Sequence, residues 1–212
     1  MFAELIGVVN LLLTAVTTVR RSASSARHEI LVLRILKVYF VLKDIIDEGE
    51  ALAVEAGPDP LATLNALDLA EANGVLVRWN EIMDRQTRRL FFIHDNLLGK
   101  NHLDVIDPEL AKKLDTAIGY KMDRVFTLHQ LGSALFFRPM FSNRESKTDT
   151  ANYVLVFAGV EEANSVVDME KIHTELDALR SALEKYRIAS EKLVSGDDLV
   201  SLSQRAREET TM

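Results

Sequence analysis

Cysteine is absent from all 212 residues of the chain. Its absence excludes disulfide bonds, thiolate zinc sites and a thiol nucleophile. It also fits a reducing compartment, because disulfides form and persist mainly in oxidising ones. We therefore expect a cytoplasmic protein without cysteine chemistry.

Residues that break regular structure are also scarce, with 9 Gly and 4 Pro in the whole chain. Few breakers predict few turns and therefore few but long elements, whereas a sandwich or barrel would need many more. We predict an all-α fold, an antiparallel helical bundle of about five long helices over residues 1–196. A short polar helix and a frayed tail are expected over residues 197–212.

A membrane-spanning apolar run is missing too. The most apolar stretch, Leu5–Val19, has 15 residues, which as a helix reach about 22 Å. The hydrocarbon core of a bilayer is about 30 Å thick. Apolar residues recur there at steps of three and four, which favours a helix packed in the bundle. A membrane anchor formed by residues 2–19 remains the alternative.

Charge is unevenly distributed along the chain. The net charge is −7, yet residues 1–43 carry six basic and two acidic residues, a net of +4, which leaves −11 for the rest. An acidic body argues against nucleic-acid binding. The basic N-terminal part suits an acidic partner or a membrane surface.

The second expected helix, residues 26–56, is apolar nearly all round, with one narrow polar stripe of Arg34, Lys37, Asp44 and Glu48. Such a pattern is typical of a central, buried helix.

A break at Gly57-Pro58 follows, and Asp59-Pro60 reads as a cap and first helical residue. The next helix is expected from Pro60 to about Leu98, with a bend or split at Gly74.

A further helix is expected from Asp107-Pro108 to Pro139, and an aromatic cluster surrounds its end. Aromatic residues and Met are enriched at interface cores. The cluster therefore has two interpretations, docking of a partner protein or a local cap over the end of the bundle. Its members are Phe136, Phe137, Met140 and Phe141. Beyond it, Tyr153–Val160 is β-branched, but we expect helix because no partner strand is visible.

The segment from Met169 to Leu193 has coiled-coil-like spacing. Apolar residues alternate steps of three and four over almost four heptads, which predicts a long helix packed along its whole length. Leu176, Leu179 and Leu183 lie at the centre of this seam. The pattern allows a partner helix in the same chain or in another protein.

His94 and Asp95 adjoin in the run LFFIHDNLLGKNHLDVID. The run resembles the His-Asp segment of HD-domain phosphohydrolases, which are all-α enzymes, and the resemblance implies that these two residues bind a metal. Two extra residues displace the following Gly99-Lys100 pair from that family's spacing. We expect a structural His94 at a helix end, where a cation is favoured.

Two other constellations have structural interpretations. A di-iron site needs two Glu-x-x-His pairs, whereas the chain has one, Glu170 with His173. Arg85, Arg88 and Arg89 share one turn, and in an acidic body they are expected to pair with neighbouring acidic faces.

No motif in the sequence identifies a reaction, and we expect no cofactor. The sequence favours a non-enzymatic accessory or scaffold subunit that binds a protein partner, or itself, through helical faces. A membrane-associated protein is the alternative, and an HD-like metal-dependent phosphohydrolase is a weaker one.

Overall fold

The computed structural model describes residues 2–19, 25–98, 112, 116, 119, 121–123, 125, 129, 169–193 and 196–211. These residues contain helices and no strand, which confirms the all-α prediction for this part of the chain. The helices are α1 (Phe2–Val19), α2 (Ser25–Ala56), α3 (Pro60–Asn65), α4 (Leu69–Leu98), α8 (Met169–Ser190) and α9 (Gly196–Glu208). The described residues between 112 and 129 are also helical. Tyr153–Val160 lies outside the described residues.

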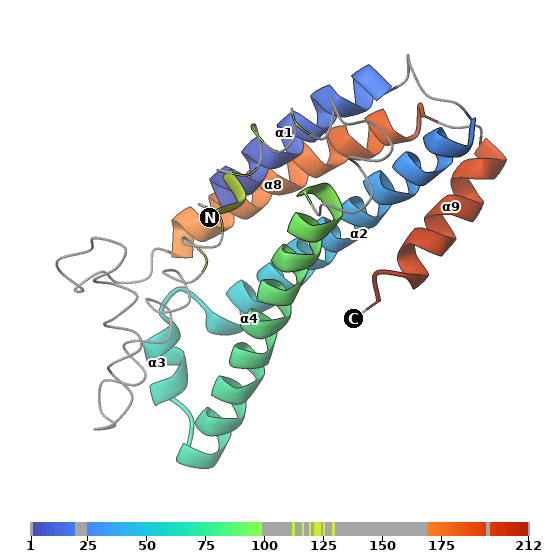
Figure 1. Cartoon of the computed structure of the whole chain (residues 1–212). Helices are drawn as coiled ribbons and strands as arrows, with labels where there is room; N and C mark the ends of the chain where they lie inside the picture. Colours follow the sequence, from blue (N-terminus) through green and yellow to red (C-terminus); the bar gives the residue numbers. More distant parts are fainter. Residues whose placement is uncertain are drawn as a thin grey trace.

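Helix α2 is the centre of the arrangement (Figure 1). It packs against α4, α8 and α9, while α1 packs against α8. Helices α4 and α8 run antiparallel to α2, but α9 runs parallel to it, and α1 runs parallel to α8. The directions are therefore mixed, whereas the sequence suggested an antiparallel bundle. Helix direction depends on the connections between helices, and apolar periodicity carries no information about it.

The core is built from the apolar faces that the periodicity predicted. In α1, Leu5, Val8, Val9 and Leu12 are buried. The α1 face is therefore covered by protein, and among the described helices α8 makes the main contact with it. Within the described ranges, no helix combines the length and apolar character that crossing a membrane requires.

Tyr186 of α8 is buried among these side chains, and its hydroxyl donates a hydrogen bond to the carbonyl oxygen of Ile35 in α2 at 3.1 Å. A buried phenol needs such an acceptor. This bond links α8 to the central helix inside the core.

The helix expected from Pro60 to Leu98 is two helices, and the split is not at Gly74. The chain leaves helix after Asn65 and enters α4 at Leu69. The Asp68 carboxylate accepts hydrogen bonds from the backbone N–H groups of Ala70 and Glu71, both at 2.9 Å. Asp68 is thus an N-cap that starts a new helix.

The earlier cap was predicted correctly. The Asp59 carboxylate accepts a hydrogen bond from the N–H of Ala62 at 3.0 Å. Gly57 ends α2 with a φ of 68°, a left-handed conformation that suits glycine.

The Asp68 cap leads to a first prediction. Asp68→Ala should reduce the free energy of unfolding by about 0.5–2 kcal/mol, because the N–H groups at the start of α4 lose their acceptor. Urea unfolding followed by circular dichroism measures the change. Asp68→Asn is the matched control and should cost little, because an amide oxygen can also cap; an equal loss in both variants would contradict the capping role.

Helix α9 closes the described part of the chain and packs on α2. It begins at Gly196 and buries Leu202 and Ala206. Thr210, in the turn after the helix, is 1% exposed, and its hydroxyl donates to the carbonyl of Ala206 at 2.9 Å. The residues expected to form a frayed tail are therefore held against the bundle up to this turn.

Candidate functional site

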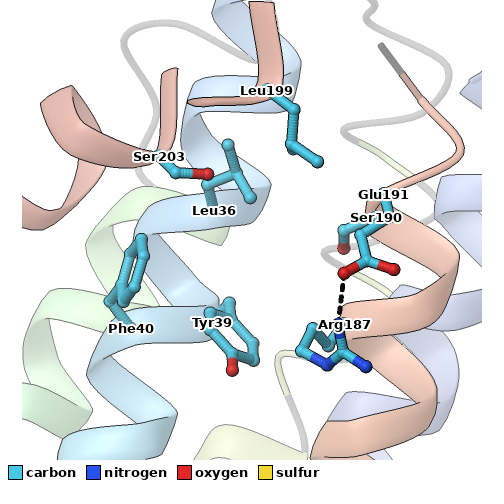
Figure 2. A pocket seen from close by; sticks show the side chains of 8 residues that line it. All are labelled: Leu36, Tyr39, Phe40, Arg187, Ser190, Glu191, Leu199 and Ser203. Atoms are coloured by element: carbon cyan, nitrogen blue, oxygen red, sulfur yellow. Dashed lines mark hydrogen bonds and ion pairs between the residues drawn. The ribbon is translucent and has the colours of Figure 1, made fainter. Parts of the chain in front are cut away.

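A cavity of about 180 Å³ lies where α2, α8 and α9 meet (Figure 2). We call it the α2–α8–α9 groove. Helix α2 forms the bottom of the groove, which we call its floor. Helices α8 and α9 form its two sides, which we call its banks. The lining residues are Leu36, Tyr39, Phe40, Arg187, Ser190, Glu191, Leu199 and Ser203.

The floor and the rim of the groove differ in chemistry. Leu36 and Phe40 from α2 face Leu199 from α9 and form an apolar base. The Tyr39 ring packs edge-on against Phe40, with centroids 5.2 Å apart. Burial raises the pKa of the Tyr39 phenol above its usual value of 10, so its hydroxyl stays protonated and can donate a hydrogen bond at neutral pH.

Charges on the α8 bank are paired with each other. Arg187 donates to Glu184 at 2.6 and 2.9 Å and also pairs with Glu191. The hydrogen bond from Arg187 lowers the pKa of the Glu184 carboxyl. The α8 bank therefore carries the Arg187 cation between the Glu184 and Glu191 carboxylates, next to the apolar floor.

The groove has room for one large apolar group. An apolar cavity of about 150 Å³ is known to hold a benzene ring. A pocket with an apolar interior and a few polar groups at its rim is typical of the sites that receive anchor side chains of a partner protein.

A second polar cluster joins α4 to α2. Arg89 of α4 donates to the Glu48 carboxylate at 2.5 and 3.2 Å, and Arg85 donates to it at 3.1 Å. Only 8% of the Arg89 side chain is exposed. The predicted pairing of these arginines with an acidic neighbouring face is confirmed for both, while Arg88 is exposed. We assign the cluster a structural role.

The predicted docking seam is buried within the chain itself. Leu176, Leu179 and Leu183 are 1%, 0% and 6% exposed, and α8 packs against both α1 and α2. The structure thus places this seam inside the monomer. The other predicted docking residues, Phe136, Phe137, Met140 and Phe141, lie outside the described residues.

His94 and Asp95 contact each other at the end of α4. His94 Nδ1 lies 3.3 Å from a carboxylate oxygen of Asp95, which is 74% exposed. His173 hydrogen-bonds through Nδ1 to the carbonyl of Met169 at 2.7 Å. Among the residues the structure describes, no group of three His, Asp or Glu side chains could hold a metal ion.

His129 is a buried histidine that the sequence did not single out. It is 2% exposed, and its Nε2 lies 3.0 Å from the Thr87 hydroxyl of α4. Burial lowers the pKa of its imidazole below the usual 6.5. The folded protein therefore holds this ring neutral.

This gives a pH prediction. The unfolded chain binds a proton at His129 more tightly than the folded protein does. The contribution of His129 to the free energy of unfolding is therefore fully present above about pH 6.5 and is lost as the pH falls below it. Urea unfolding at pH 7.5, 6.5 and 5.5 should show a decline that is smaller in His129→Gln, which cannot titrate. An identical decline in both proteins would contradict the assignment.

The groove could not be located from the sequence, because α2 is apolar on most of its faces and gives no sign of which neighbour covers which face. No protein-family model matches the chain, and comparisons with the curated proteins and with the solved structures likewise found no match.

Proposed function

We propose that the chain is a non-enzymatic accessory or scaffold subunit that binds a partner protein at the α2–α8–α9 groove. The observation that carries the proposal is an open cavity with an apolar floor and a polar rim, built by three helices. Protein interfaces concentrate binding energy in such anchor pockets.

Two exposed apolar side chains support the proposal. Ile188 of α8 is 41% exposed and lies one turn from Glu191, and Val200 of α9 is 60% exposed and lies one turn from Ser203. Residues three apart on a helix are neighbours on its surface. Apolar area therefore continues from the groove onto both banks, as expected of a surface that a partner covers.

Site-specific photocrosslinking in the native host tests the proposal. A photoreactive amino acid is placed at Ile188 on the α8 bank or at Lys43, one turn from Tyr39 and Phe40 on α2. We expect both positions to give the same crosslinked partner. Leu69, 77% exposed at the start of α4, is the control position and should not give it.

A surface substitution completes the test. Ile188→Glu should abolish the crosslink from Lys43 while the circular dichroism spectrum and melting temperature stay unchanged, because the replaced side chain is exposed. A crosslink that persists in this variant, or that appears equally at Leu69, would disprove the groove as the binding site.

A further inference from the structure

The α8 bank of the groove carries more negative than positive charge. Among the eight described residues that line the groove, Arg187 is the one cation. All three nitrogens of its guanidinium already donate to carboxylates, two to Glu184 and one to Glu191. Two carboxylates therefore share one cation, and one negative charge is left uncompensated. A cationic group is attracted to this bank, whereas an anionic group is repelled.

The other charged groups that flank Tyr39 and Phe40 leave this excess unchanged, because they are paired. Lys43 pairs with Asp47 on the outer face of α2. Arg207 of α9 lies 5.6 Å from the centroid of the Phe40 ring and pairs with Asp44. The whole chain is also acidic, with a net charge of −7. An acidic protein attracts a basic partner segment and raises its rate of association.

The apolar part of the groove suits an aromatic ring. Leu36, Phe40 and Leu199 form its base, and the Tyr39 ring lies at 71° to the Phe40 ring. Aromatic rings favour such edge-to-face contacts, and a further ring can extend them. The volume of about 180 Å³ exceeds that of a cavity known to hold benzene. A phenyl or indole group therefore fills the space, whereas a short side chain would leave part of it without contacts.

Two hydroxyl groups of the groove are available for hydrogen bonds. Within the described ranges, those of Tyr39 and Ser203 donate to no protein group, whereas Ser190 donates to the carbonyl oxygen of Tyr186 at 2.8 Å. Figure 2 shows Ser203 and Glu191 on opposite sides of the groove. Polar groups placed around an apolar base fix the orientation of the group that binds there.

We propose that the groove receives an aromatic side chain of the partner protein, and that a lysine or arginine next to this side chain pairs with Glu184 and Glu191. The ring lies on the apolar floor, and the cation lies against the α8 bank. Helix α9 keeps its place, because it supplies one side of the groove. The inference rests on the proposed function, since it names the chemistry of the partner segment that occupies the same groove.

Two indole compounds of opposite charge test the preference for a cation. Tryptamine and indole-3-propionate carry the same ring on a two-carbon chain, which ends in an ammonium group or a carboxylate. Titration of the full-length protein, followed by nuclear magnetic resonance, should give tryptamine a Kd on the order of 1 mM. Indole-3-propionate should bind about fivefold more weakly at low salt, and the difference should shrink as salt is added. Equal binding of the two compounds, or binding of neither, overturns the proposal.

A matched pair of charge variants assigns the preference to the α8 bank. Glu191→Gln removes one carboxylate and should reduce the preference for tryptamine to about twofold or less. Asp177→Asn makes the same change of charge on the exposed face of α8, about 20 Å away along the helix, and should leave the preference at its wild-type value. An equal reduction in both variants would show that only the overall charge of the protein matters, and would overturn the assigned pairing.

A second pair of variants tests the position of the ring. Ser203→Phe places a ring in the groove and should abolish binding of both compounds, because the space that they need is filled. Ser201→Phe adds the same ring at an exposed position of α9 and should bind both compounds normally. Both variants should keep the wild-type melting temperature. Binding that persists in Ser203→Phe overturns the site.

The partner segment is identified through the crosslink from position 43. Mass spectrometry of the crosslinked partner peptide should find an aromatic residue next to a lysine or arginine. Ser203→Phe should abolish this crosslink, and Ser201→Phe should retain it. A crosslinked segment that lacks this pair of residues overturns the proposal.

The two proposals fail separately. A partner crosslinked at Ile188 and Lys43, without a preference of the groove for tryptamine, would keep the proposed function and remove the aromatic and basic segment. A preference for tryptamine without any crosslinked partner would remove the proposed function and assign the groove to a free aromatic amine.

Discussion

Replacing both Leu176 and Leu183 by Ala should lower the free energy of unfolding by about 4–10 kcal/mol. Each truncation of a buried Leu costs about 2–5 kcal/mol, because apolar contact is lost and a cavity remains. The two residues are seven apart, about 10 Å along α8, so their effects should add. A single domain is stable by only about 5–15 kcal/mol, and the double variant should be largely unfolded.

Urea and thermal unfolding measure this loss, with Asp177→Ala and Lys185→Ala on the exposed face of α8 as a matched double control. The control should stay within about 1 kcal/mol of the wild type. The loss should not depend on protein concentration, because the seam is buried inside one chain. A fully stable double variant that fails only to associate would contradict this packing.

Glu48→Ala should lower the free energy of unfolding by about 3–5 kcal/mol. Arg89 makes two hydrogen bonds to the Glu48 carboxylate at a position where little water reaches. Removing one partner of a buried ion pair leaves the other charge without its counter-ion, and that cost exceeds the net contribution of the pair. Asp44 lies 4.0 Å from Arg89 and compensates only in part.

Two further variants separate the charge effect from lost packing. Asp47→Ala removes the neighbouring exposed pair with Lys43 and should cost about 0–1 kcal/mol. Glu48→Leu combined with Arg89→Met replaces the pair by apolar groups and should recover most of the stability lost in Glu48→Ala. A double variant as unstable as Glu48→Ala would show that burial of an unpaired charge is not the cause.

Apolar periodicity predicted which faces would be buried. The face of α1 and the seam of α8 follow the spacing of their apolar residues, since a helix must cover one stripe. Capping was predicted at Asp59 but missed at Asp68, although Asp68 is followed by Glu71 at capping-box spacing. The sequence interpretation gave more weight to Gly74, which remains helical.

The position of the groove depends on which helices pack together. The spacing of apolar residues along the sequence does not specify these helix pairs. Helix α2 is apolar on nearly every side, so nothing local distinguishes the face of Leu36 and Phe40 from the face toward α4. Helix α9 has the sequence GDDLVSLSQRARE, in which polar residues outnumber apolar ones, and it therefore reads as a polar segment. Its position became apparent only through pairs such as Arg207 with Asp44, which are far apart in the chain.

The packing of α1 on α8 has a consequence for synthesis of the protein on the ribosome. Helix α1 is translated before α8, and the residues of α8 that cover it follow more than 150 positions later. At about 5–20 residues per second this interval lasts roughly 8–30 s. Throughout it, Leu5, Val8 and Leu12 lack their main cover, so the nascent chain presents an apolar helix to which a ribosome-associated chaperone can bind.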